Sequence, residues 1–109
     1  MQVFLGLKSS VGDEAFCAIL EKIVIDLSDL KTEIGTARKE PDLLAMRRAS
    51  HVLISLAGAV GASRLLGDAK SLNVYANDGN LTQVDAKSRA CNEDIARLIG
   101  FVNEKRKMM

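Results

Sequence analysis

The chain reads LLAMRRASHVLISLAGAVGA from Leu43 to Ala62, and this stretch decides the fold. Along it, apolar or small residues recur at alternating intervals of three and four, with one serine among them. This spacing is that of an a/d seam on an amphipathic α-helix, so it predicts a helix with one face packed in a bundle. The seam consists of Leu43, Met46, Ser50, Leu53, Ala57 and Val60.

Three further seams with the same alternation occupy the rest of the chain. The connections between them are short, which makes successive helices antiparallel neighbours. We therefore expect an all-α, up-down-up-down four-helix bundle, with residues 1–109 as a single domain. The three seams are Phe16, Leu20, Ile23, Leu27, Leu30 and Ile34; then Ala62, Leu65, Ala69, Leu72 and Ala76; then Leu81, Val84, Ser88, Cys91, Ile95, Leu98 and Val102.

Cap residues mark the expected ends of the first helix. Ser10, with Asp13 three residues later, resembles a capping box. Gly35 falls near the other end, although the helix can run on to Arg38. The apolar segment 3–7 predicts a short helix, or lid, over one end of the bundle.

The later boundaries follow from proline, glycine and asparagine. Segment 40–42, Glu-Pro-Asp, suits the first turn of the second helix. We expect that helix to end or kink over residues 58–61, where two glycines weaken it. Segment 77–80, Asn-Asp-Gly-Asn, predicts a turn, with Asn80 as the N-cap of the last helix.

Composition excludes several classes of protein. Hydrophobic residues make up 48% and aromatic residues 4%, which favours a helical core over a β-sandwich or barrel. A net charge of +1 leaves no electrostatic footprint for nucleic acid. The one basic run, residues 105–107, is interpreted as a solvated helix end. Without a signal peptide or about 18 consecutive apolar residues, we expect no membrane span and a cytoplasmic location.

The residue types that bind metals and nucleotides are sparse. Cys17 and Cys91 are far apart and lie in or beside apolar seams, so we interpret them as buried, reduced thiols. One histidine and no Cys-x-x-Cys pair disfavour structural zinc. Gly58 and Gly61 do not lead into a Gly-Lys-Ser/Thr phosphate loop, which disfavours ATP binding. We expect no cofactor and no metal site in the chain itself.

His51 is the chain's one histidine. At about 100° per residue it lies more than about 90° from the centre of its seam, which places it on the solvent side. It shares that stripe with Leu44, Arg48, Ser55 and Gly58. A bundle cofactor needs inward-facing ligands, so haem or metal ligation is disfavoured. Two interpretations stay open: a surface histidine of no consequence, or a neutral imidazole that attacks phosphorus.

His51, Leu53, Val60, Gly61 and Ala62 stand in the register of a known signature. The stretch resembles histidine-containing phosphotransfer (HPt) domains, in which the histidine is followed by Leu, Lys-Gly, small residues and an apolar-Gly-Ala step. The resemblance extends to the helices before and after it and so covers nearly the whole chain. It implies a four-helix phosphocarrier without autokinase activity. In such a protein, His51 accepts a phosphoryl group from a receiver-domain aspartate and passes it to another receiver.

Two positions depart from the family's pattern. The family's lysine is Ile54 here and its glycine is Ser55. The resemblance implies that the lysine neutralises the phosphoryl group. Arg47 and Arg48 adjoin the same surface and are candidates to replace that charge, with solvated arginines as the alternative.

Other residues around the histidine are candidates for phosphoryl or partner binding. Ser55 permits close approach and offers a hydroxyl to a phosphate oxygen, and Gly58 keeps the surface low. Asn73 falls where the family often places a polar residue near the phosphohistidine. Ile54 either extends an apolar docking patch with Leu44 or packs on a neighbouring helix.

The resemblance also implies the partners. These are response-regulator receiver domains, with a hybrid sensor kinase as a further candidate, and Mg²⁺ would come from the receiver's acidic pocket. Four seams in one chain favour a monomer. Sensor-kinase dimerisation domains match less well, because Val52 stands where they usually have an acidic residue, and no proline follows. Two alternatives are a degenerate HPt-like bundle that binds a receiver or kinase without catalysis, which Ile54 favours, and a plain helical scaffold.

Overall fold

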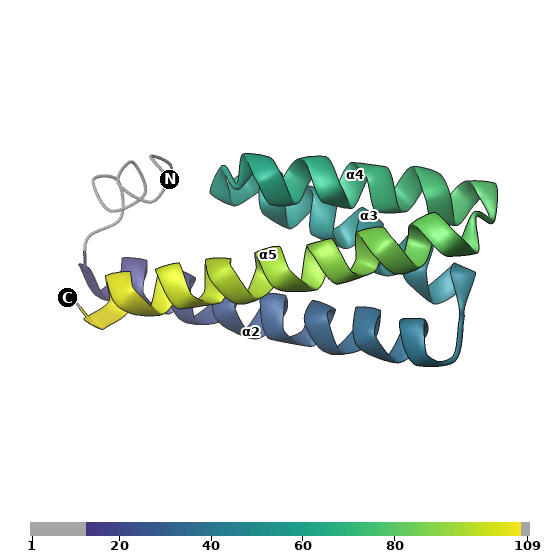
Figure 1. The fold of residues 1–109 in the computed structure, drawn as a ribbon. Coiled ribbons are helices and arrows are strands. Elements are labelled where there is room, and N and C mark those ends of the chain that lie inside the picture. The colour runs from purple at the N-terminus through teal and green to yellow at the C-terminus, as the bar shows by residue number, and fades with distance from the viewer. Residues whose placement is uncertain (1–12, 108–109) are drawn as a thin grey trace.

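The computed structural model describes residues 13–107, which form four α-helices (Figure 1). They are α2 (Asp13–Lys39), α3 (Leu43–Val60), α4 (Ser63–Asp78) and α5 (Leu81–Lys107). Successive helices run antiparallel, and α5 returns to lie beside α2. Both α2 and α4 therefore contact α3 and α5, and the expected up-down-up-down bundle is confirmed.

The start of α2 lies at the edge of the described residues. The expected short helix over residues 3–7 and the expected cap at Ser10 both fall outside them. At its other end α2 continues past Gly35, which brings Arg38 and Lys39 into its last turn. Basic side chains are favourable there because the helix dipole is negative at that end.

The N-terminus of α3 differs from the expectation by one turn. Segment 40–42 does not form the first helical turn, since α3 begins at Leu43. Asp42 is instead the N-cap, with φ −128° and ψ 95°. Its carboxylate accepts a hydrogen bond from the Ala45 N–H at 3.0 Å. That bond satisfies a backbone donor that the first turn of a helix leaves free, and so fixes where α3 starts.

The remaining turns depend on two glycines and an asparagine. Gly61 after α3 and Gly79 after α4 have φ of 74° and 72°, a left-handed conformation that glycine adopts readily. The second turn is shorter than expected, because α4 extends through Asp78. Asn80 caps α5 as expected, and its Oδ1 accepts from the Gln83 N–H at 3.2 Å.

The four seams meet in one core. Leu43 and Ala62 are half-buried at the edge, and Leu81 is the exception, with 56% of its surface exposed in the first turn of α5. Leucine and isoleucine side chains from all four helices are fully buried, which is the main stabilising contribution to such a fold. They include Leu20, Leu27, Ile34, Leu53, Leu72 and Ile95.

By length and composition, α3 is apolar enough to cross a membrane, and it is the one helix among residues 13–107 that is. Arg47 and Arg48 interrupt its apolar run, so a search for about 18 consecutive apolar residues does not select this helix. Within the bundle, its buried side chains form the core seam between α2 and α4. A third of the helix (33%) is buried in this way, and α3 is only weakly apolar, so it is not a clear membrane span.

One cysteine is less buried than expected, and the basic tail makes a contact that was not expected. Neither Cys17 nor Cys91 forms a disulfide, and Cys91 is buried whereas Cys17 is half-buried. Burial, with nearby carboxylates, raises the pKa of Cys91 to about 12, which keeps it protonated. Arg106 is not merely solvated, since it donates to Glu21 Oε1 at 3.1 Å and joins α5 to α2.

A buried carboxyl group lies between α4 and α5. Asp94 has a side chain that is 6% exposed, and its Oδ1 lies 3.0 Å from Arg97 Nη1 and 3.7 Å from Arg64 Nε. Asp68, across on α4, pairs with Lys87 of α5 at 3.5 Å. Burial, together with the neighbouring Asp68 carboxyl group, raises the pKa of Asp94 to about 6.

Candidate functional site

His51 lies in the middle of α3 on its exposed side. Ser50 and Leu53, one residue before it and two after it, are fully buried, so the opposite side of the helix is anchored in the core. Since α3 is capped at both ends, the position of His51 is set by a complete helix. Among residues 13–107 the imidazole has no hydrogen-bond or ion-pair partner, which leaves its nitrogens open to an incoming group.

The structure brings most of the predicted site residues together around the histidine. Arg47, Arg48, Ser55 and Gly58 are exposed on the same side of α3. This arrangement follows from their spacing of three, four and seven residues from His51, which helical geometry places on one stripe. We call these four residues and His51 the His51 face. Ile54 and Asn73 are half-buried beside it.

Two arginines lie one helical turn before His51 on the exposed side of α3. The carbonyl of Arg47 accepts a hydrogen bond from Asn73 of α4, whereas Arg48 lines a hollow shared with α2. Neither guanidinium has an ion-pair or hydrogen-bond partner within residues 13–107. Both are therefore available to an anion brought to His51, and guanidinium donors suit phosphate oxygens.

A polar bridge, which we call the Ser50–Asn73 bridge, joins α3 to α4 beside the histidine. Asn73 Nδ2 donates to Ser50 Oγ at 3.0 Å and to the Arg47 carbonyl at 3.4 Å. Ser50 Oγ in turn donates to the same Arg47 carbonyl at 3.0 Å. Asn77 Nδ2 completes the set by donating to Asn73 Oδ1 at 3.1 Å. These bonds satisfy a fully buried hydroxyl and tie the turn before His51 to α4.

The Ser50–Asn73 bridge was only partly foreseeable. Ser50 looks like a mere interruption of the seam, although a buried serine in an apolar seam requires a partner. Asn73 was selected for contact with a phosphoryl group, and that contact stays a prediction. In this structure both ends of its amide are engaged within the protein, so Asn73 positions the His51-bearing turn.

Ile54 stands at the lysine position of the HPt-domain resemblance. The surroundings of Ile54 distinguish the two roles considered for it. Its side chain is half-buried and packs against the core. Leu44, with 57% of its surface exposed, stays in solvent. Packing on the bundle is therefore the structural role of Ile54, and the cations near His51 come from Arg47 and Arg48.

Ser55 and Gly58 keep the surface around His51 low. A Cβ at Gly58 would meet no atom within 4 Å, so packing does not require glycine there. Its effect is to leave open space two turns from the imidazole. Ser55, on the same side of α3 as His51, also lines a hollow shared with α2.

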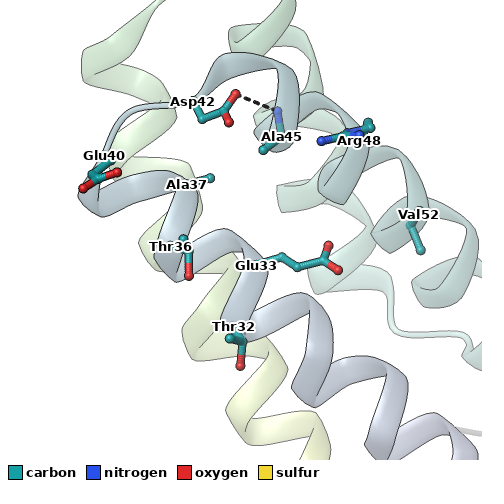
Figure 2. A pocket seen from close by; sticks show the side chains of 9 residues that line it. All are labelled: Thr32, Glu33, Thr36, Ala37, Glu40, Asp42, Ala45, Arg48 and Val52. Carbon is teal, nitrogen blue, oxygen red and sulfur yellow. Dashed lines mark hydrogen bonds between the residues drawn. The ribbon is translucent and has the colours of Figure 1, made fainter.

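The α2–α3 groove runs beside the His51 face. It consists of two hollows of about 610 and 490 Å³ that share Glu33 and Val52. Figure 2 shows the first of them, with Glu33 reaching from α2 toward α3 and Arg48 on the facing helix. The other lining residues are Asp26, Asp29, Leu30, Thr32, Thr36, Ala37, Glu40, Asp42, Ala45, Ser55 and Leu56. The α2 side of the groove was not predicted from the sequence, because the residues of α2 that face α3 depend on how both helices are rotated about their axes.

No group of three or more His, Cys, Asp or Glu side chains that could hold a metal ion occurs among the residues described. The expectation that a partner supplies Mg²⁺ stays a prediction. The His51 face itself offers an imidazole, two guanidinium groups and a hydroxyl. Together these groups can bind an anionic group that another molecule presents.

Comparison with known proteins gives one informative likeness. No protein-family model matches the chain, and no curated protein matches its sequence. Its structure is similar to the crystal structure of histidine-containing phosphotransfer protein B (HptB) from Pseudomonas aeruginosa PAO1, with a TM-score of 0.89 and 22% sequence identity. The match covers 99% of this chain and 93% of that one. The chain therefore has the fold of a histidine-containing phosphotransfer protein, which supports the family resemblance.

Proposed function

We propose that this chain is a histidine phosphocarrier of a two-component phosphorelay. The observation that carries the proposal is His51, an exposed imidazole in the middle of a helix of an HPt-type fold, one turn after two arginines that, like it, have no partner among residues 13–107. Its partners in this role are receiver domains that carry an aspartyl phosphate. The chain contributes a nucleophile, a charged surface and a docking face, and no kinase activity.

In the forward step, the lone pair on Nε2 of neutral His51 attacks the phosphorus of the aspartyl phosphate. A P–N bond forms while the acyl P–O bond breaks, and the receiver's aspartate leaves as a carboxylate with the electron pair. Nδ1 keeps its proton, so charge is balanced. A second receiver reverses the step when its carboxylate attacks the phosphoryl group and restores the neutral imidazole.

The other residues of the His51 face neutralise the charge of the phosphoryl group and leave room for it to approach. Arg47 and Arg48 pair with the phosphoryl oxygens from both sides and replace the charge that Ile54 does not supply. Ser55 donates its hydroxyl to an oxygen, and Gly58 leaves room for the partner. Mg²⁺ held in the receiver's acidic pocket would help to neutralise the charge of the phosphoryl group.

The test is transfer from receivers phosphorylated beforehand and drawn from the protein's own genome. We expect acid-labile, base-stable phosphate on this chain, which distinguishes phosphohistidine from a base-labile acyl phosphate. His51→Gln is the decisive variant because no other histidine exists in the sequence. It should fold normally, since the side chain is exposed, and should lose all of the label.

Arg48→Ala and Arg47→Ala each remove one guanidinium group near His51 and leave the imidazole itself unchanged. Each should slow transfer by about ten-fold while His51 stays labelled, because a charge-assisted hydrogen bond is worth about 1.5 kcal/mol. Asp78→Asn, an exposed change on α4, is the control and should transfer at the wild-type rate. Label that survives His51→Gln would contradict the proposed site.

A non-catalytic interaction module is the second candidate. The observation that favours it is Ile54, which places a half-buried apolar side chain where the family has a lysine. Such a module would bind receivers and never carry phosphate. Binding without label on any receiver would exclude the phosphocarrier and establish this alternative.

A further inference from the structure

One oxygen of the buried Asp94 side chain has no hydrogen-bond donor. The other oxygen, Oδ1, lies 3.0 Å from Arg97 Nη1 and 3.7 Å from Arg64 Nε. Asp94 Oδ2 is also buried, and it receives no hydrogen bond from an N–H or hydroxyl group within residues 13–107. A buried carboxylate oxygen without a donor is destabilising, so the group that faces it decides how it is satisfied.

The group that faces Asp94 across the interface is a second acid. The carboxyl group of Asp68, on α4, lies within hydrogen-bonding reach of the Asp94 carboxyl group. Two ionised carboxylates accept hydrogen bonds and donate none, so these side chains can bond only when one of them carries a proton. A proton between them supplies the donor that Asp94 Oδ2 lacks, in a charge-assisted O–H···O⁻ hydrogen bond.

The cations around the two acids compensate their charge only in part. The side chains of Arg64 and Arg97 are 79% and 61% exposed, and Arg97 also lies 3.9 Å from Glu93. Lys87 of α5 is 3.5 Å from Asp68 and is the least exposed of the three cations. Ion pairs with solvated side chains are worth little. Two ionised carboxylates would therefore still repel each other across the interface.

The thiol beside the two acids is uncharged. Cys91 of α5 lies near both of them, and burial, with the two carboxyl groups, raises its pKa to about 12. Helix α2 also packs on α5, but its ion pairs with α5 are made by Asp85 and Arg106. Neither Cys91 nor α2 therefore offsets a change of one proton on the two acids.

We propose that Asp68 and Asp94 share one proton and so form a pH-sensitive latch between α4 and α5. With the proton in place, the two carboxyl groups are hydrogen-bonded and hold the helices together. When the proton passes to solvent, the carboxylates repel each other and the helices open more often at this point. The Ser50–Asn73 bridge holds the other flank of α4 to α3, so the latch sets how firmly the helix that supports the His51 turn is held. The latch does not depend on whether His51 carries phosphate.

The latch closes in acidic solution. Burial, together with the Asp68 carboxyl group, raises the pKa of Asp94 from 3.8 to about 6. When the helices open, water reaches the acid and its pKa returns toward the ordinary value, so the closed form binds the proton more tightly. The stabilisation of the closed form is therefore complete below about pH 4 and is lost as the pH rises through about 6.

Carbon-13 NMR of the full chain measures the shared proton. The Cγ resonances of Asp68 and Asp94 should move with one common midpoint near pH 6, because a shared proton titrates as a property of the pair. In Asp68→Asn the midpoint of Asp94 should fall by about one pH unit, since burial remains and the second acid is gone. Asp78→Asn removes an exposed carboxylate from the same helix and is the matched control, so it should leave the midpoint unchanged.

Two outcomes of this titration would overturn the shared proton. One is an Asp68 resonance that does not move near pH 6. The other is an Asp94 midpoint that is the same in Asp68→Asn as in the wild type, which would assign the raised pKa to burial alone.

Amide hydrogen exchange measures the latch itself. After correction for the intrinsic pH dependence of exchange, local opening around Asp68 and Asp94 should be about ten-fold more frequent at about pH 8 than at about pH 5. Asp94→Asn keeps an amide donor for Asp68 at every pH and should abolish this dependence, whereas Asp78→Asn should behave like the wild type. Two results would show that the proton does not latch α4 to α5. These are unchanged opening in a wild type whose Asp94 titrates near pH 6, and an equal change in all four helices.

Discussion

Two groups of carboxylates in this bundle differ in their surroundings. One group lies between α4 and α5 and is paired with cations, whereas the other lies along the groove between α2 and α3 and is largely unpaired. Asp94 is buried and contacts two arginines, and Asp68 beside it pairs with a lysine. Asp29 and Glu33 line an open groove and pair with nothing among residues 13–107. The first pair contributes to how α4 and α5 pack, while the second leaves its charge to solvent or to a partner.

The difference comes from what surrounds each carboxylate. A buried charge is costly to leave unpaired, so the α4–α5 interface supplies cations from both helices. Exposed carboxylates are solvated by water and gain little from a partner in their own chain. Stability should therefore depend strongly on charge at the α4–α5 interface and weakly on charge in the α2–α3 groove.

Charge reversal at one site in each region should give the largest contrast. Asp94→Lys places a buried cation between Arg64 and Arg97 and should lower the free energy of unfolding by about 3–5 kcal/mol. Glu33→Lys, in the groove, should change it by no more than about 0.5 kcal/mol. Urea unfolding followed by circular dichroism measures both. Comparable losses at the two sites would break the distinction between the regions.

The second contrast is in pH dependence. Burial raises the pKa of Asp94 from 3.8 to about 6, so the folded protein holds this proton more tightly than the unfolded chain. The resulting stabilisation is present below about pH 4 and is lost as the pH rises through about 6. Asp94→Asn cannot titrate, so its stability relative to the wild type should increase by about 1–3 kcal/mol between about pH 4 and 7.

Unfolding curves at several pH values across that window measure the effect. Asp78→Asn removes an exposed carboxylate and should run parallel to the wild type throughout. Parallel curves for Asp94→Asn as well would show that Asp94 titrates normally and that the α4–α5 interface is no more sensitive than the groove.

The smallest expected effect concerns the Ser50–Asn73 bridge, which lies between the two regions. Asn73→Ala removes the hydrogen bond to buried Ser50, whose hydroxyl keeps its bond to the Arg47 carbonyl. The free energy of unfolding should fall by about 1 kcal/mol. Amide hydrogen exchange should accelerate around His51 and not in the groove-facing turns of α2. Asp78→Ala, an exposed change on α4 outside the bridge, is the control, and uniform acceleration over all helices would argue against a local bridge.

Much of the fold and part of the site could be predicted from the sequence. The intervals of three and four residues predicted all four helices and their buried faces, with Leu81 as the main error. The same periodicity placed His51 with Leu44, Arg48, Ser55 and Gly58 on one exposed stripe, as the structure confirms. Periodicity suffices for these features because each concerns residues within a single helix.

Features shared between helices were not predictable in this way. Asn73 was selected by resemblance, but its bonds to Ser50 depend on how α4 lies against α3. The closeness of Asp68 and Asp94 depends likewise on the register of α4 against α5. A shift of one residue in either register would turn these side chains by about 100° and separate them.

By itself, the sequence determined that this protein is a four-helix bundle with one exposed histidine on a capped helix, since helical phase and capping are local properties. Only the tertiary structure decided which polar groups meet. It joined Ser50 to Asn73, buried Asp94 beside Asp68, and left Asp29 and Glu33 unpaired along the α2–α3 groove. These pairings depend on the rotation and offset of the packed helices. Side chains throughout the core determine that rotation and offset jointly.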